Sequence, residues 1–207
     1  LAQAKARAAR ARPLRPRAIR FLQRDLISPP RSASPLPPAD VLFVGNFSIG
    51  EFHDRGALVA YLRRARARLR PRRGVFVCDT YGGETAFTLG SLRRVHQDPR
   101  DPALRVHYTW QQRHADPLTA RVENALHFRV ERAGEIVQDL PDAFIYRWRL
   151  WSVPELRDAL LEAGFRDVAV YNQTPDAEDD RGRPFIQPLD DPRDLDPSFV
   201  VCVAARA

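Results

Sequence analysis

The spacing of hydrophobic residues changes several times along this chain, and each change predicts an element. Asp40–Val44 is a continuous apolar run between turn residues, which is typical of a strand buried on both faces. Apolar residues then recur at helical spacing, at Leu58, Tyr61, Leu62, Ala65 and Leu69. Pro71 and Gly74 end this helix, and Gly74–Cys78 is a second apolar run that ends at Asp79. Strand, helix and strand in this order predict a parallel βαβ unit.

The chain before this unit divides into three short stretches. Residues 1–17 are typical of a basic helix or arm broken by prolines. Ala18–Leu22 is short and apolar and is a candidate strand, closed by Asp25. Ser28–Pro38 is a loop by composition. We therefore expect one domain to span residues 18–205, after a basic arm at residues 1–17.

In the middle of the chain, polar and apolar residues alternate with the period of a strand that buries one face. Three segments show this period: Val106–Arg113, Arg121–Glu131 and Ala143–Trp151. Ala133 and Gly134 supply a tight turn between the last two segments. We expect the three strands to form an antiparallel flap, residues 106–151, inserted into the α/β domain.

The C-terminal part begins with a helix signal. Ser152 at the N-cap and Glu155 three residues later match a capping box, and Gly164 ends the helix. Two apolar strands follow, at Val168–Tyr171 and Phe199–Ala204. The acidic, proline-rich stretch Thr174–Pro197 between them predicts a surface loop.

Charge changes this picture only at the N-terminus. The chain has 33 basic and 26 acidic residues, a formal net charge of +7. Residues 1–20 contain seven basic and no acidic residues, so they carry the whole excess. Basic arms bind phosphates, and RNA modification through this arm is one hypothesis. Because the arm lacks interleaved aromatic residues and its Ala/Arg content fits a solvated helix, we expect no nucleic-acid partner.

The two cysteines, Cys78 and Cys202, lie inside apolar runs and show no metal-ligand spacing. We interpret them as reduced, buried thiols of a cytoplasmic protein, and we expect no metal. The sequence contains no apolar run approaching the ~18–20 residues that cross a bilayer, so we expect no membrane partner.

Two blocks of the sequence resemble class I S-adenosylmethionine (SAM)-dependent methyltransferases. In Asp40–Gly83, the residues LRP, a glycine and an apolar strand ending in Asp79 look like the family's approach to strand five. In Pro154–Tyr171, the residues LLEAGF are similar to the helix and strand six of many small-molecule methyltransferases. The final FVVCVAAR looks like strand seven, and YGG, YTWQQ and AFIYRWRLWS resemble a bacterial branch of the family.

The resemblance covers residues 18–205 and implies the fold class. This is α/β, with a Rossmann-like sheet made of the family's strands three to seven and an antiparallel β insertion. The family's glycine-rich cofactor loop follows its strand one, where the backbone must approach the cofactor closely. No Gly-x-Gly cluster precedes Asp40, and the first glycine is Gly45. The acidic residue after strand two is also missing, so the chain resembles a methyltransferase entered after that loop.

Ligands of open α/β sheets bind beyond the carboxyl ends of the strands, which selects two candidate groups for SAM. By resemblance, Asp25 accepts the adenine amino group and the backbone N–H of Leu26 meets a ring nitrogen. Gly45, Asn46 and Phe47 end the next strand, and Asn46 can donate and accept at the methionine end. The alternatives are local ones: a loop or N-cap aspartate, and a common Gly-Asn turn.

Four aromatic residues are candidates for binding the methyl acceptor. Tyr81 follows the second strand of the βαβ unit, in a Tyr-Gly-Gly turn that lets the backbone approach a ligand. Trp110 lies on the first flap strand, and Tyr146 and Trp148 share one face of the third. Aromatic walls hold cationic or planar substrates, but the same residues also stabilise cross-strand pairs without any ligand.

Three further polar residues have both a functional and a structural interpretation. His53 is the candidate general base, because imidazole titrates near neutral pH; the alternative is a solvated helix residue. Arg147 and Arg149 alternate with the flap aromatics. They either bind a carboxylate substrate or form an ion-paired face, and we favour the ion-paired face.

These features predict a SAM-dependent methyltransferase that acts on a small molecule, with SAM as its cofactor. The alternative, which follows from the missing glycine-rich loop, is a non-catalytic methyltransferase-like remnant that binds a partner or ligand without turnover. The two differ in whether the chain binds SAM and transfers its methyl group.

Overall fold

The computed structural model describes residues 21–27 and 37–207. Residues 37–207 form one compact unit, whereas residues 1–36 belong to another. The expected basic arm, residues 1–17, lies outside the described residues. The elements that follow all belong to the compact unit.

The first expected strand lies in the N-terminal unit. Its residues 18–20 are outside the described part of the chain, and Phe21 and Leu22 are not in a strand. Leu22 is exposed. The carboxylate of Asp25 accepts a hydrogen bond from the backbone N–H of Ile27 (2.9 Å), a local Asx turn.

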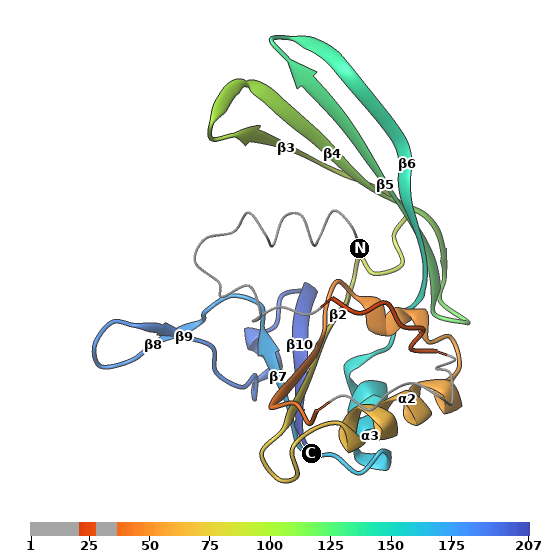
Figure 1. The fold of residues 1–207 in the computed structure, drawn as a ribbon, viewed down its shortest axis with the longest axis vertical. Coiled ribbons are helices and arrows are strands. Elements are labelled where there is room, and N and C mark those ends of the chain that lie inside the picture. The colour runs from red at the N-terminus through yellow and green to blue at the C-terminus, as the bar shows by residue number, and fades with distance from the viewer. Residues whose placement is uncertain (1–20, 28–36) are drawn as a thin grey trace. The chain divides into compact units, whose positions relative to one another are not determined.

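Four strands form the central sheet, in the order β1 (Val41–Val44), β2 (Val75–Gly83), β10 (Ser198–Arg206) and β7 (Arg166–Asn172) (Figure 1). β1 and β2 are parallel, and β10 runs antiparallel to both of its neighbours. The predicted parallel βαβ unit and the predicted α/β fold are confirmed. The last apolar run is the antiparallel strand that the sequence predicts, and it lies inside the sheet.

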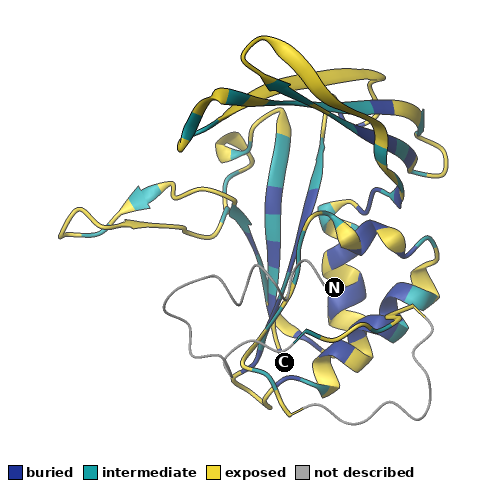
Figure 2. Cartoon of the chain, turned by 45° about the horizontal axis from the view of Figure 1, so that its top comes forward, coloured by how far each residue is buried: buried dark blue, intermediate teal, exposed yellow. Residues whose placement is uncertain are grey.

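Two helices cover one face of this sheet: α2 (Arg55–Ala67) and α3 (Val153–Glu162) (Figure 2). The side chain of Asp54 caps α2 by accepting from the N–H of Ala57. The capping box predicted for α3 is confirmed. The helices and the sheet enclose one core, which includes Leu58, Leu62, Phe76, Cys78, Trp151, Leu156, Leu160, Phe165 and Val203.

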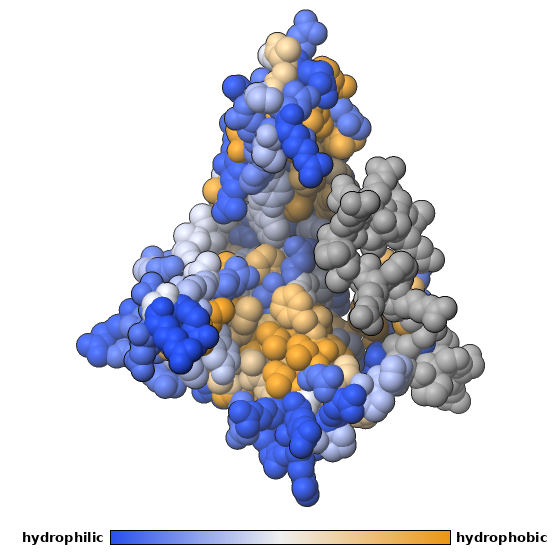
Figure 3. All heavy atoms as spheres, turned by 60° about the vertical axis from the view of Figure 1, so that its left-hand side comes forward, coloured by the Kyte–Doolittle hydropathy of each residue, from blue (hydrophilic) through white to orange (hydrophobic). Residues whose placement is uncertain are grey.

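The opposite face of the central sheet is open among the described residues. Val41 and Phe43 of β1 point away from the helices and remain 61% and 62% exposed. Figure 3 brings forward the side of the molecule away from the helices and shows apolar surface there. β1 pairs only with β2 within the part of the chain that the structure describes, so its outer edge carries free backbone groups.

A second, antiparallel sheet has the order β3 (Gly90–Asp98), β4 (Asp101–Asp116), β5 (Arg121–Arg132) and β6 (Glu135–Arg149). It stands over the carboxyl end of β2 (Figure 1). The three predicted strands are present, but the sheet contains β3 as well. β3 was not predicted because it is almost entirely exposed, and burial therefore imposes no alternation on its residues.

Local turn chemistry shapes this second sheet. Ala133 and Gly134 both adopt positive φ, 50° and 90°, so the predicted tight turn between β5 and β6 is confirmed. β6 begins earlier than predicted, because the strand runs through Pro141 and Asp142 with a register shift in its pairing with β5. Asp142 itself adopts a φ of 49°, which marks the irregularity.

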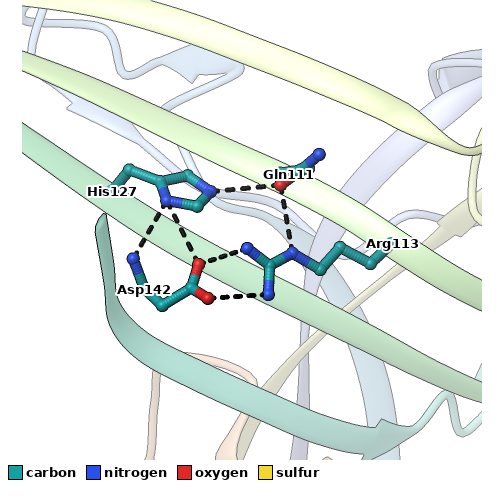
Figure 4. A network of polar contacts seen from close by, with 4 residues as sticks. All are labelled: Gln111, Arg113, His127 and Asp142. Atoms are coloured by element: carbon teal, nitrogen blue, oxygen red, sulfur yellow. Dashed lines mark hydrogen bonds and ion pairs between the residues drawn. The ribbon is translucent and has the colours of Figure 1, made fainter.

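A polar network occupies the outward face of the second sheet (Figure 4). The N–H of Asp142 donates to Nδ1 of His127 (3.0 Å), while Nε2 of His127 donates to Oε1 of Gln111 (3.2 Å). The guanidinium of Arg113 forks onto the Asp142 carboxylate and holds the pKa of that carboxyl below its usual range. These groups satisfy one another, so this face is a solvated, ion-paired surface.

The predicted acidic loop, Thr174–Pro197, is only partly irregular. It contains the short hairpin β8 (Ala177–Glu178) and β9 (Pro184–Phe185), and the 3₁₀ helix η2 (Pro192–Asp194). Among the residues that the structure describes, no helix is both long and apolar enough to cross a membrane.

Candidate functional site

A buried carboxylate in the middle of β2 lies beside the carboxyl end of β1. Asp79 of β2 is 6% exposed. Its two carboxylate oxygens accept hydrogen bonds from the backbone N–H groups of Asn46 (2.9 Å) and Phe47 (2.7 Å). Hydrogen bonds to a charged acceptor are stronger than neutral ones, so Asp79 fixes the conformation of the residues that follow β1.

The turn that Asp79 holds is strained. Asn46 and Phe47 adopt φ values of 59° and 57°, in the left-handed region. Asparagine tolerates this region, but phenylalanine has no local hydrogen bond to offset its cost there. The strain persists because two hydrogen bonds to Asp79 over-determine the turn. Strained backbone of this kind is characteristic of ligand sites.

β2 runs further than the sequence predicts. We expected Tyr81, Gly82 and Gly83 to form a flexible turn, but they pair with Val200, Phe199 and Ser198 of β10. Gly83 has a φ of 89°, and a Cβ there would lie 1.9 Å from the carbonyl oxygen of Pro197. The glycines therefore permit close strand packing at the end of the sheet, and the turn prediction was wrong.

The aromatic candidates lie together around Phe47. Its ring centroid is 5.0 Å from that of Tyr81, 5.8 Å from that of Trp148 and 6.2 Å from that of Trp110, each in an edge-to-face arrangement. Tyr146 stacks on Trp148 at 4.5 Å, so the predicted shared face of these two residues is confirmed. Rings from the second sheet thus contact the turn held by Asp79, and this group of five rings is called the aromatic cluster.

Buried polar side chains fix the rings of the cluster. Asn124 of β5 is fully buried; its Oδ1 accepts from Nε1 of Trp110 (2.9 Å), and its Nδ2 donates to the hydroxyl oxygen of Tyr81 (3.3 Å). The Tyr81 hydroxyl lies 3.5 Å from Oε1 of Gln112. Burial raises the pKa of Tyr81 to about 12, although the hydrogen bond from Asn124 acts to lower it. Tyr81 is therefore a neutral hydrogen-bonding group at neutral pH.

The 3₁₀ helix η1 (Ser48–Glu51) brings the turn against the second sheet. Nε1 of Trp148 donates to the carboxylate of Glu51 (2.9 Å). A Cβ on Gly50 would lie 2.8 Å from Cβ of Trp148, so only glycine allows this close approach. Ser48 does not cap the helix, since the structure shows no side-chain hydrogen bond at its N-terminus.

His53 lies between η1 and α2, and it contacts the second sheet. Its Nε2 is 2.7 Å from the backbone carbonyl oxygen of Arg147, which can only accept, so Nε2 carries a proton. Only Nδ1 remains as a base. The role of His53 as a general base stays a prediction.

The two flap arginines are ion-paired, as favoured from the sequence. Arg147 contacts Glu123 (2.8 Å) and Arg149 contacts Glu155 (3.1 Å). The guanidinium of Arg149 also lies 3.8 Å from the centre of the Trp151 ring. These contacts account for the positions of both arginine side chains without a bound carboxylate substrate.

The structure brings some predicted site residues together and leaves others apart. Gly45, Asn46 and Phe47 lie at the end of β1, next to the acceptor candidates of the aromatic cluster. Asp25 and Leu26 belong to the N-terminal unit, so their predicted role toward SAM stays a prediction. Among the described residues, no group of three or more His, Cys, Asp or Glu side chains is arranged to hold a metal ion.

Sequence reasoning missed the polar residues that support the cluster. Asn124, Gln112 and Glu51 were not singled out. A signal was present for Asn124, because it occupies the apolar face of its strand between Val122 and Leu126. A polar residue on an otherwise apolar face has to be satisfied by a partner, which points to a specific network.

Comparison with solved structures gives this chain the fold of SAM-dependent methyltransferases, as the resemblance of its sequence implied. One such structure is a SAM-dependent methyltransferase from Clostridium acetobutylicum ATCC 824, with a TM-score of 0.59 and 15% identity over 99% of this chain and 69% of that chain. DesVI from Streptomyces venezuelae gives a TM-score of 0.59 and 17% identity, over 89% of this chain and 63% of that one.

A third similar structure is CalS10 from Micromonospora echinaspora, described as an amino pentose methyltransferase with bound SAM. It gives a TM-score of 0.55 and 14% identity, over 88% of this chain and 63% of that one. This chain thus spans about two thirds of the length of these structures. No protein-family model and no curated protein matches its sequence.

Proposed function

We propose that this chain is part of a SAM-dependent methyltransferase that acts on a small molecule in the cytoplasm of a bacterium. The observation that carries the proposal is the strained Asn46–Phe47 turn at the carboxyl end of β1, held by Asp79 of the parallel strand β2 and packed against aromatic rings. Ligands of open α/β sheets bind at this edge. Proteins of the same fold that are described as a sugar N-methyltransferase and an amino pentose methyltransferase support the small-molecule acceptor.

The residues at the turn fit one end of SAM. Asn46 is exposed, so its amide can donate to and accept from the methionine portion, while its backbone is fixed by Asp79. The electron-rich faces of Phe47 and Tyr81 suit a cationic sulfonium. When bound, SAM supplies an electrophilic methyl group.

The chain's own residues have three roles in this proposal. Asp79 positions the turn, and Asn46 binds the cofactor. Tyr81, Trp110, Tyr146 and Trp148 exclude water and form a wall for the acceptor. Because the Tyr81 hydroxyl is already hydrogen-bonded to Asn124, it orients the acceptor rather than removing its proton. A neutral amine acceptor needs no base before it attacks.

Isothermal titration of the full chain with SAM, and with S-adenosylhomocysteine as the matched ligand without the methyl group, tests the proposal. We expect saturable binding of both. Incubation with SAM labelled at its methyl group and a panel of amino sugars then reports transfer. Saturable binding with transfer supports the proposal, and absence of binding to both ligands contradicts it.

The second candidate is a methyltransferase-like protein that binds a ligand without turnover. Saturable SAM binding without transfer to any acceptor in the panel would support this candidate over the first.

A further inference from the structure

A cavity of about 690 Å³ has Tyr81 in its wall. Its wall combines the end of β2, the start of α3, the β4–β5 turn and the stretch that contains η2. The residues that matter below are Tyr81, Phe87, Val153, Leu189, Leu195 and Phe199. Small-molecule sites commonly have volumes of ~300–1,000 Å³ and mostly apolar walls.

The charged and polar groups of this wall are largely satisfied within the protein. Ser152 and Glu155 hydrogen-bond each other in the capping box of α3. Asp191 accepts from the backbone and the guanidinium of Arg193. Arg157 and Asp190 also line the cavity, but most of its wall is aromatic and aliphatic.

We propose that this cavity binds the apolar, ring-containing body of a small molecule. The driving force is burial of apolar surface, which is removed from water when the ligand binds. Tyr81 links the cavity to the aromatic cluster, because its ring forms part of the cavity wall and also packs against Phe47. If the chain acts as proposed above, this body belongs to the methyl acceptor; that extension rests on the proposed function, whereas the binding itself does not.

The apolar wall of the cavity predicts a methyl acceptor other than a free amino sugar. Because the wall is mostly apolar, most hydroxyl groups of a free sugar would lose their water without finding a partner there, which is unfavourable. A ring system of hydrocarbon character, alone or attached to a sugar, suits this wall better. The cavity thus favours an acceptor that carries an apolar body.

Titration with N-phenyl-1-naphthylamine, a neutral apolar fluorophore, tests the proposal on the full chain. We expect saturable fluorescence enhancement that Leu195→Trp weakens by roughly tenfold or more, because the larger ring fills the cavity. The matched control is Leu161→Trp, the same substitution at an exposed position of α3 outside the cavity. The control should leave the affinity unchanged.

Two further variants separate the cavity from other apolar surface. Val153→Phe also fills the cavity, and it provides the readout if thermal unfolding shows that Leu195→Trp does not fold. Phe43→Ser removes apolar surface from the open face of the sheet and should leave the affinity unchanged. Binding that survives both cavity-filling substitutions, or that is lost only with Phe43→Ser, overturns the proposal.

The same samples are titrated with SAM. Loss of fluorophore binding with unchanged SAM binding supports a separate cavity. If the wild-type chain binds the fluorophore in the cavity but not SAM, the proposed function fails while the cavity site stands. If it binds SAM but no variant changes fluorophore affinity, the cavity site fails alone.

Discussion

At the scale of single residues, Asp79 does most to define the candidate site. It sits inside the sheet among apolar neighbours, where an ionised carboxylate is costly unless it is hydrogen-bonded. Both of its oxygens reach backbone N–H groups of the turn after β1. The carboxylate and the turn therefore stabilise each other, and neither is favourable alone.

Replacing Asp79 with asparagine keeps the size of the side chain but turns one acceptor into a donor that faces a backbone N–H. We expect a loss of about 2–3 kcal/mol in the free energy of unfolding, measured with urea. SAM affinity should fall as well, because the turn loses its anchor. The control, Asp196→Asn at an exposed position, should change stability by less than about 0.5 kcal/mol. An equal effect of both substitutions would contradict the anchoring role.

Substitution of Asn46 tests whether this residue serves only the conformation of the turn or also binds SAM. Because its φ is positive, Asn46→Gly should raise stability slightly, by about 0.5 kcal/mol, while it removes the amide proposed to bind SAM. Ala133→Gly relieves a comparable φ in the β5–β6 turn, far from the site in sequence. We expect weaker SAM binding in the first variant only, by calorimetry. If Asn46→Gly binds SAM as well as wild type, Asn46 is merely a turn residue.

Two tyrosines, the buried Tyr61 and the half-buried Tyr81, make the chain sensitive to alkali. Burial raises the pKa of both Tyr61 and Tyr81 to about 12, above the value of 10.0 in the unfolded chain. The unfolded state therefore loses these protons first, and stability present below about pH 10 is lost as the pH rises toward about 12. Urea unfolding at pH 8 and pH 11 should show this loss. Tyr61→Phe should reduce the pH dependence, whereas an unchanged slope would assign it to other groups.

At the scale of elements, local sequence signals were reliable where a residue has one physical role. Ser152 and Glu155 form the capping box that their spacing predicts, with hydrogen bonds in both directions. Gly164 adopts a φ of 91°, and the N–H of Phe165 bonds the carbonyl of Leu160 as in a Schellman end. α3 is thus specified at both ends by its own residues.

Ser152→Ala should cost about 1 kcal/mol of stability, because it removes the N-cap acceptor. Burial acts to raise the pKa of Glu155, but hydrogen bonds from Ser152 and the charge of Arg149 hold this pKa below its usual value. The contribution of Glu155 is therefore present above about pH 4.5 and is lost as the pH falls through its folded pKa. The stabilities of wild type and Glu155→Gln, measured by urea unfolding, should converge as the pH falls below the folded pKa of Glu155; a constant difference would contradict this.

The sequence predicted secondary structure less well for elements that the core does not bury. β1, α2, β2, α3, β7 and β10 were predicted because the core imposes their periods. β3 has no such constraint, and β2 continues past Asp79 only because β10 pairs with it from more than a hundred residues away. The site follows the same rule: its positions at strand ends were predictable, whereas the hydrogen bonds of Asn124 and Asp79 depend on contacts between distant segments.

At the scale of the whole molecule, two sheets of different kinds meet at the aromatic cluster. The central sheet provides the strained turn, and the antiparallel sheet provides three of the rings against it. Neither sheet contains the candidate site alone. The open face of the central sheet, with Val41 and Phe43 exposed, lies on the side away from the helices.

The position of β10 between β2 and β7 also sets an order of events in time. The antiparallel sheet is built from neighbouring hairpins within residues 90–149, and such local contacts form quickly. In the central sheet, the β1–β2 pair and β7 stay apart until β10 (residues 198–206) inserts between β2 and β7. Pulse-labelling hydrogen exchange during refolding should therefore protect amides of β4 and β5 before those of β2. Simultaneous protection would mean that the hairpins form only with the completed central sheet. During synthesis, one edge of β2 stays unpaired until β10 has been made.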